Sequence, residues 1–212
     1  AEAILPYVSL IARGYDSRVI LLTIVDAGAV KVSDKKQEYL TQLSEQVSTN
    51  SRDYLRKIGD QLRSENLTVE EVVVSGRPAD TIVAYAERAG VELIAMSTHG
   101  RSGLGRWIIG SVVDSVLHFA AVPMLVIRPI ERSVHKTVKI TKLVVPLDGS
   151  TLAESILPYA KDLAKKFKLD IVLLQAVSIA SLVGVGSESE PYTVYPSDLL
   201  SEMQASANSY LT

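Results

Sequence analysis

The stretch that decides the fold runs from residue 92 to residue 127 and reads ELIAMSTHGRSGLGRWIIGSVVDSVLHFAAVPMLVI. Its first six residues, Glu92 to Ser97, have the length and apolar character of a buried strand, and a glycine-rich loop follows as far as Ile109. The pattern then predicts a helix from Ser111 to Ala120 and a strand from Met124 to Ile127. A strand, a helix and another strand in this order are typical of parallel pairing.

The same alternation continues on the amino-terminal side. We expect a helix over residues 2–13, a strand over 18–25, a long helix from 33 to about 64, a strand over 69–75 and a helix from Pro78 to Arg88. Pro6 should kink the first helix unless it lies in the first turn. Alternating strands and helices predict an α/β fold, a doubly wound open parallel sheet with helices on both faces.

An internal repeat divides the chain. Residues 1–8, AEAILPYV, recur at 153–160 as AESILPYA, which is an offset of 152 residues. The apolar run at 19–25 matches the run at 171–177 with the same offset. Two amphipathic helices that resembled each other by chance would not also share the proline. The pattern therefore indicates one supersecondary unit used twice.

Both copies are incomplete in this sequence, so we expect it to be a piece of a longer gene product or a chain with further residues at its ends. The second copy begins with a predicted strand, Leu143–Leu147, and a loop, Asp148-Gly149-Ser150, which the first copy lacks because Ala1 aligns with Ala153. It also stops inside a helix that is long in the first copy. The predicted parts are a first domain at 1–128, a charged linker at 129–140 and a second domain at 141–212.

Composition excludes several classes of function. Lys and Arg total 22 against 24 Asp and Glu among 212 residues, so the basic surplus of a nucleic-acid-binding protein is missing. There is no cysteine and the three histidines are scattered, so we expect neither disulfides nor a metal site. No apolar run reaches eighteen residues and no secretory signal is present, so we predict a cytoplasmic protein without a membrane span.

The loop after Ser97 is suited to bind phosphate. Glycines allow backbone N–H groups to approach an anion closely, hydroxyls add donors, and arginines add charge at the rim. The helix that begins at Gly110-Ser111 adds the positive end of its dipole. The residues that supply these groups are Ser97, Thr98, Gly100, Arg101, Ser102, Gly103, Gly105 and Arg106.

An ordinary glycine-rich connection explains the same spacing equally well, and in that case Ser111 only caps a helix. The loop is neither a Walker loop, since no Gly-Lys-Ser/Thr occurs, nor a dinucleotide fingerprint. Capping-box patterns occur at two helix starts, Ser111 with Asp114 and Thr151 with Glu154.

The loop, the segment PLDGS at 146–150 and the segment PMLVI at 123–127 together resemble the universal stress protein family. The likeness covers nearly the whole chain, as a tandem pair, and implies an adenine nucleotide alpha hydrolase-like fold. The nucleotide-binding branch of that family carries Gly-x2-Gly-x9-Gly-Ser/Thr after its fourth strand. Its second and third glycines match Gly100 and Gly110, with Ser111 following, whereas Ser97 stands at the first glycine.

The resemblance implies a site for ATP, with or without Mg²⁺ or Mn²⁺. An Asp after the first strand faces the nucleoside and matches Asp148, although a turn residue before Gly149 is an equally good interpretation. A main-chain contact to adenine matches Ile24, or Ala176 in the second copy. The first copy thus has the loop without the Asp, and the second has the Asp without the loop. The expected nucleotide-binding residues are Ile24, Met96, Ser97, Thr98, His99, Gly100, Arg101, Ser102, Gly103, Gly110, Ser111, Val112, Pro146 and Asp148.

We predict an ATP-binding universal stress protein that acts as a regulatory module in the stress response, through nucleotide-dependent association. The alternative is a nucleotide-free scaffold that acts through dimer surfaces, which Ser97 favours. No catalytic residue is expected, His99 more naturally positions the backbone, and the protein is at most a slow ATPase. The resemblance implies a homodimer, or an intrachain pseudo-dimer, through the apolar strand Met124–Ile127. Residues 178–196 are predicted to form a long insertion.

Overall fold

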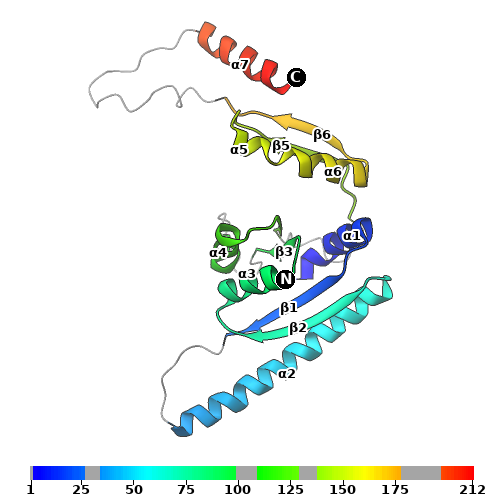
Figure 1. Ribbon diagram of the computed structural model, residues 1–212, viewed down its shortest axis with the longest axis vertical. Helices are drawn as coiled ribbons and strands as arrows, with labels where there is room; N and C mark the ends of the chain where they lie inside the picture. The colour runs from blue at the N-terminus through cyan, green and yellow to red at the C-terminus, as the bar shows by residue number, and fades with distance from the viewer. Residues whose placement is uncertain (1, 27–33, 99–108, 129–137, 178–196) are drawn as a thin grey trace, which may run out of the picture. The chain divides into compact units, whose positions relative to one another are not determined.

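The computed structural model describes residues 2–26, 34–98, 109–128, 138–177 and 197–212 (Figure 1). The chain divides into two compact units, Ala1–Val138 and Lys139–Thr212, called unit 1 and unit 2 below. Their boundary falls inside the segment predicted as a linker. Most of that linker and the whole predicted insertion at 178–196 lie outside the described residues, so both stay predictions.

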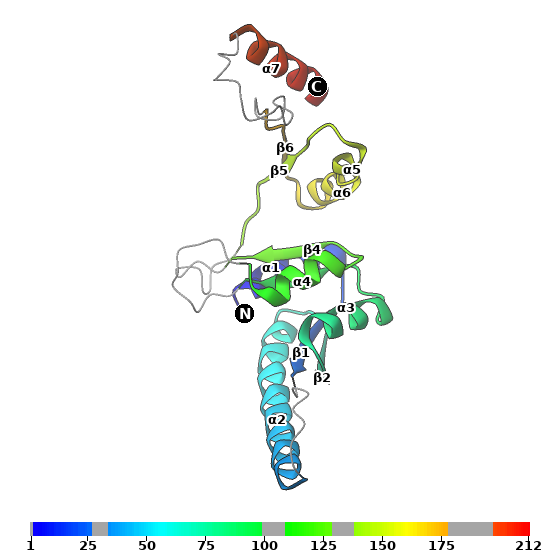
Figure 2. The same cartoon turned by 90° about the vertical axis from the view of Figure 1, so that its left-hand side faces the viewer.

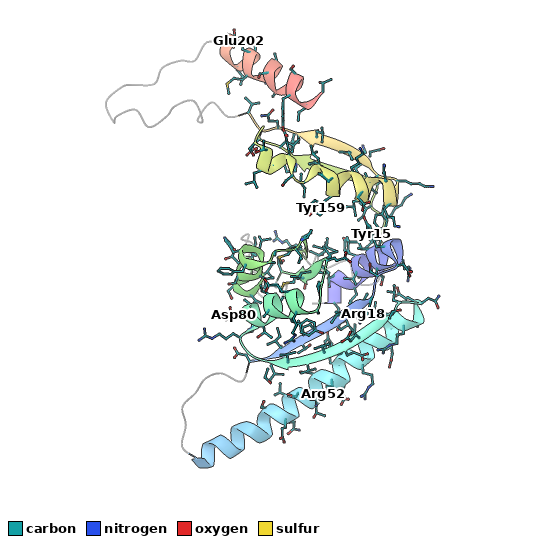
Figure 3. All side chains as sticks on the ribbon, in the orientation of Figure 1. Tyr15, Arg18, Arg52, Asp80, Tyr159 and Glu202 are labelled. Atoms are coloured by element: carbon teal, nitrogen blue, oxygen red, sulfur yellow. The ribbon has the colours of Figure 1, made fainter. Side chains whose placement is uncertain are left out.

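Unit 1 alternates helices and strands in the predicted order. Its elements are η1 (Glu2–Ile4), α1 (Leu5–Tyr15), β1 (Val19–Val25), α2 (Asp34–Ser64), β2 (Val69–Ser75), α3 (Pro78–Arg88), β3 (Ile94–Ser97), α4 (Ser111–Phe119) and β4 (Met124–Ile127). Pro6 lies in the first turn of α1, where its missing N–H has no partner to lose, which is the position for which no kink was expected. Asp80 lies in the first turn of α3, near the positive end of the helix dipole (Figure 3).

The strands of unit 1 form two parallel pairs. β1 pairs with β2 from Val19↔Val69 onward, and Arg18 forms an ion pair with Glu70 at 3.2 Å beside the start of this ladder (Figure 3). β3 pairs with β4 over its whole length. Among the described residues, no strand joins one pair to the other. The parallel α/β class expected from the sequence is confirmed.

The apolar core of unit 1 has two parts. Helix α2 runs along β1 and β2 in both views (Figures 1 and 2), and its Leu62 and Ile58 are buried with Ala12 of α1 and Val19 of β1. The second part lies between α3, β3 and α4, where Ala86, Ile94 and Val116 are buried together. Each strand pair is therefore held by its own apolar cluster.

Unit 2 is a smaller strand–helix–strand arrangement. It comprises β5 (Lys142–Pro146), α5 (Thr151–Glu154), α6 (Leu157–Phe167), β6 (Asp170–Leu174) and α7 (Ser197–Leu211). β5 pairs with β6 in parallel, with Lys142 opposite Asp170 and Pro146 opposite Leu174. Val145 and Leu147 are buried against Ala160 of α6, and Leu211 of α7 packs on this cluster.

Helices α1 and α6, which the repeat relates, have the same start and the same end. Each has proline in its first turn, and each ends at a residue in the left-handed conformation, Asp16 with φ 53° and Lys168 with φ 56°. The N–H of each end residue donates to the carbonyl four residues earlier, at Ala12 and Ala164 respectively. The repeated sequence therefore adopts repeated local structure in the two units.

A tyrosine–glutamate contact also occurs in both units. The Tyr54 hydroxyl donates to Glu2 at 3.2 Å, and the Tyr210 hydroxyl donates to Glu154 at 2.8 Å. Burial, together with Glu2, raises the pKa of Tyr54, and the hydrogen bond to Glu154 raises the pKa of Tyr210. Glu2 and Glu154 are repeat equivalents, so the contact links the same two helices in each unit.

Candidate functional site

The predicted site residues of unit 1 lie where its strands end. Ile24 is the penultimate residue of β1, opposite Val74 of β2. Met96 and Ser97 end β3, and the Thr98 N–H extends the ladder by donating to the Ile127 carbonyl at 3.0 Å. In a parallel α/β sheet, ligands bind beyond the carboxyl ends of the strands, so the predicted site would lie at these strand ends and stays a prediction.

Helix α4 packs on β3, and Val112 of its first turn lies against the same apolar cluster as Met96 near the end of that strand. Gly110 is its N-cap residue, is buried, and accepts the Asp114 N–H at 3.0 Å through its carbonyl. Ser111 and Val112 follow in the first turn, and Val112 packs against the β3–β4 core. No side chain caps the helix at Gly110, so the N–H groups of its first turn are not capped from the N-cap position.

The predicted capping box of Ser111 with Asp114 is therefore wrong. A capping serine must stand at the N-cap with extended backbone, and here Gly110 occupies that position at φ −59° and ψ 146°. Ser111 is already the first helical residue, so its hydroxyl cannot reach the N–H groups two and three positions further on in the usual way. The consequence is a helix start without a side-chain cap.

The central part of the predicted loop, including His99, Gly100, Arg101, Ser102 and Gly103, lies outside the described residues. Gly105 and Arg106 lie there as well. The roles expected of these residues stay predictions. The described part of the site consists of the strand end at Ser97 and Thr98 and the helix start at Gly110.

In unit 2, Asp148 organises a tight turn after β5. Pro146 ends that strand, and the Asp148 carboxylate accepts the Ser150 N–H at 2.9 Å. Hydrogen bonds with the Ser150 side chain and backbone lower the pKa of Asp148. Gly149 adopts φ 86°, a conformation that side chains disfavour. The turn role that the sequence left open for Asp148 is therefore present, and its role toward a nucleotide stays a prediction.

The same turn corrects the second capping prediction. Ser150, not Thr151, is the N-cap of α5, because its hydroxyl accepts the Ala153 N–H at 3.1 Å. The Asp148 hydrogen bond holds Ser150 in extended backbone at ψ 147°, so the helix starts at Thr151. The capping box read from the sequence therefore placed the N-cap one residue too late, at Thr151 instead of Ser150.

Gln175 is a polar residue that sequence reasoning missed. Its Oε1 is buried and has no hydrogen-bond partner among the described residues. Its Nε2 lies 3.9 Å from the position that a Cβ on Gly149 would occupy. Its repeat equivalent in the first copy is Thr23, so the sequence offered no signal for it. An unpaired buried acceptor beside the Asp148 turn is suited to receive a donor from a ligand.

The Asp148 turn predicts a pH-dependent effect. The Ser150 bonds lower the folded-state pKa of Asp148 below its unfolded value of about 4, so the stabilisation is present above that value and is lost as the pH falls through the folded pKa. We expect Asp148→Asn to lower the urea midpoint of unit 2 at pH 7 and to change it less at low pH. Equal shifts at both pH values would contradict this.

The described residues were also searched for metal sites and for membrane-spanning helices. They contain no group of three histidine, aspartate or glutamate side chains placed to hold a metal ion. None of the helices described has the length and apolar character needed to cross a bilayer.

Comparison with known proteins places these observations in context. A family model described as the universal stress protein family matches residues 2–128. Two universal stress proteins of Methanocaldococcus jannaschii are similar to this chain. One is 26% identical over 141 residues, which cover 60% of this chain and 87% of that protein. The other is 29% identical over 118 residues, which cover 56% of this chain and 69% of that protein. The crystal structure of a universal stress protein from Archaeoglobus fulgidus superposes on this chain with a TM-score of 0.66, covering 85% of this chain and 66% of that one. The two sequences are 20% identical, so this likeness supports the fold alone.

Proposed function

Because the chain belongs to the universal stress protein family, we propose that unit 1 binds ATP beyond the carboxyl ends of its strands. The bound nucleotide would regulate association with a partner in the stress response. The cytoplasmic location expected from the sequence remains part of this proposal.

The start of α4 is the observation that carries the proposal. Helix N-termini attract anions because their first N–H groups lack intrahelical partners and the helix dipole is positive there. Gly110 supplies no side-chain cap to these groups, and Val112 in the first turn of α4 packs against the same apolar cluster as Met96 near the end of β3. A glycine here also lets a phosphate approach the backbone closely.

The spacing of the motif supports the same ligand. Gly100, Gly110 and Ser111 stand at the positions expected of the nucleotide-binding branch. Ser97 replaces the first glycine of that motif and ends β3, where it is half-buried. A serine is small enough to leave room for phosphate. The same substitution is the observation that favours the alternative, a nucleotide-free scaffold.

The nucleoside end of the site would involve Ile24 and an aspartate equivalent to Asp148 of the second copy. Ile24 would contact adenine through its main chain, as the resemblance implies. No cluster of side chains for a metal exists among the described residues, so Mg²⁺ or Mn²⁺ would be held chiefly by the phosphates. We propose no catalytic residue, and any hydrolysis of ATP would be slow.

The β3–β4 pair offers a surface for association. β4 pairs with β3 on one edge, and no other described strand lies along its second edge. An apolar edge strand tends to pair with another strand. We propose that β4 pairs with its equivalent in a second unit, either within a longer chain or in a homodimer, and that the nucleotide held at the end of β3 influences this pairing.

Titration with a fluorescent ATP analogue tests the ligand. We expect saturable binding in the micromolar range and a loss of at least about tenfold in affinity for Gly110→Val. The backbone at Gly110 has φ −59° and ψ 146°, which any residue adopts, so valine adds a side chain beside the first-turn N–H groups without backbone strain.

His118→Val serves as the matched control, since it places the same side chain at the exposed opposite end of α4. Thermal unfolding of each variant verifies folding. Unchanged affinity in Gly110→Val, or no binding by the original chain, would refute the ATP site and leave the scaffold as the better hypothesis.

A further inference from the structure

A cavity of about 470 Å³ lies between α2 and the end of β2. Ser75, the last residue of β2, is opposite Val25 in the ladder with β1, so the cavity lies at the edge of the sheet where these parallel strands end. Ligands of parallel α/β proteins bind at this edge. The other lining residues come from α2 and are Ser44, Glu45, Ser48, Thr49 and Arg52.

The course of α2 explains why a polar cavity forms here. Its buried Ile58 and Leu62 pack near the first residues of β1 and β2, and the helix runs along both strands (Figures 1 and 2). The lining residues of α2 are three or four positions apart, so they share one face of the helix. Apolar side chains therefore lie between the helix and the start of the strands, whereas hydroxyl and charged side chains line the cavity at their end.

Arg52 supplies the positive charge of the cavity. It lies near the middle of α2 (Figure 3) and forms no ion pair with another described residue. Arg56, one turn further along the helix, pairs with Asp53 at 3.4 Å. A guanidinium group carries five N–H donors in a fixed plane, which suits the oxygens of an anion. Arg52 is therefore available to a ligand, whereas Arg56 already has a carboxylate partner.

Hydroxyl groups add donors to the cavity, and Glu45 adds an acceptor. The Thr49 hydroxyl donates to the Glu45 carbonyl at 3.0 Å, whereas the hydroxyls of Ser48 and Ser75 have no hydrogen bond to a described residue. The carboxylate of Glu45 can only accept. It repels an anion that has no proton, but an oxyanion that carries a proton can donate a hydrogen bond to it.

We propose that this cavity binds inorganic phosphate in its hydrogen phosphate form. Arg52 and the serine hydroxyls donate to the phosphate oxygens, and Glu45 accepts a hydrogen bond from the remaining P–OH group. Sulfate is fully ionised at neutral pH and lacks this donor. A phosphate ester also lacks it above a pKa of about 6, whereas hydrogen phosphate keeps its last proton well above neutral pH. The site therefore selects the free ion.

The repeat indicates that the helix packs without this arginine. Tyr54 of α2 and Tyr210 of α7 are equivalent, since each donates to the equivalent glutamate of its unit. The same alignment places Asn208 at Arg52. A neutral amide at this position is therefore compatible with the helix, which makes Arg52→Gln a suitable test. The proposed site belongs to unit 1 alone.

An NMR titration of the ¹⁵N-labelled chain tests the site without nucleotide. At about pH 7.5 and constant ionic strength, inorganic phosphate should shift the amide signals of Ser48, Arg52 and Ser75 saturably, with a Kd on the order of 1 mM because the cavity is open to solvent. Sulfate should bind at least about fivefold more weakly. Arg52→Gln should lower the affinity for phosphate at least about fivefold.

Arg56→Gln is the matched control, because it makes the same change of charge one turn away on the same helix. It should leave the affinity for phosphate within about twofold. Glu45→Gln should raise the affinity for sulfate more than that for phosphate, because the repulsion is removed and the acceptor of the P–OH group is weakened. Circular dichroism verifies that each variant is folded.

Equal affinities for phosphate and sulfate in the original chain overturn the proposal, and so do equal losses in the two arginine variants. Signals that shift only in the first turn of α4 also overturn it, and they place phosphate at the proposed ATP site instead. Because the comparison of phosphate with sulfate needs no substitution, the proposal stays testable even if Arg52→Gln fails to fold.

Discussion

Leu62→Ala is expected to destabilise unit 1 by about 2–5 kcal/mol, which is the usual cost of removing a large side chain from a core. Leu62 is 0% exposed and lies in the cluster that joins α2 to α1 and β1. In this cluster Leu62 of α2 packs with Val19 of β1 and Val69 of β2, so a cavity there weakens the attachment of the helix to both strands. Urea unfolding followed by circular dichroism measures the change.

Val47→Ala is the control for this prediction. Val47 lies on the same helix but is 42% exposed, so its truncation should change stability by less than about 1 kcal/mol. If the two variants unfold at the same urea concentration, the cluster around Leu62 does not hold α2 in place, and the assignment of the core to this helix is wrong.

Leu21→Pro and Leu22→Pro should differ strongly although the residues are neighbours. The backbone of Leu21 takes part in the ladder with β2, whereas the backbone of Leu22 faces the opposite edge of β1, along which no described strand lies. Proline has no N–H to donate, so at Leu21 it leaves a carbonyl of β2 unpaired and costs about 2 kcal/mol or more. At Leu22 no ladder bond to a described strand is lost.

Alanine at each position removes the contribution of the leucine side chain. The quantity to compare is the stability of the proline variant relative to the alanine variant at the same residue, measured by urea unfolding of dilute protein. A penalty at Leu22 as large as that at Leu21 would contradict the prediction and show that the Leu22 N–H has a partner outside the described strands. The expected order is a large penalty at Leu21 and a small one at Leu22.

Local signals predicted most of the helices and strands. Apolar periodicity placed β2 at its observed residues and α2 within one residue of its start, and Pro78 marked the first turn of α3. These features depend on neighbouring residues along the chain. β3 begins at Ile94, two residues later than expected, because Ile94 is the first residue of the run whose N–H reaches the neighbouring strand, at Pro123.

Features that depend on distant residues were harder to predict. Both capping boxes were wrong by one residue, since the N-cap is chosen by the turn before the helix, as the Asp148–Ser150 bond shows. Helical spacing does not encode that turn. The separation of the strands into two pairs in unit 1 was likewise not predicted, because pairing is decided by contacts between segments far apart in the sequence.

The candidate site was predicted in part. Ser97 ends β3, Thr98 follows it, and Gly110 is the N-cap of α4, while the nucleotide site predicted at these residues stays a prediction. The missing side-chain cap at Gly110 was not foreseen, although it strengthens the case for an anion. The buried Oε1 of Gln175 could not be foreseen either, since burial of a single polar atom depends on tertiary packing.

The matched helices α1 and α6 have a practical consequence for protein engineering. Because the repeat is collinear and both helices have the same starts and ends, residues 139–152 can be joined directly to Ala1 without adding or removing a residue. The resulting polypeptide, 139–152 followed by 1–128, would place the aspartate and the glycine loop in one continuous gene segment. Such a single-unit protein would be a convenient size for NMR spectroscopy and for ligand screening.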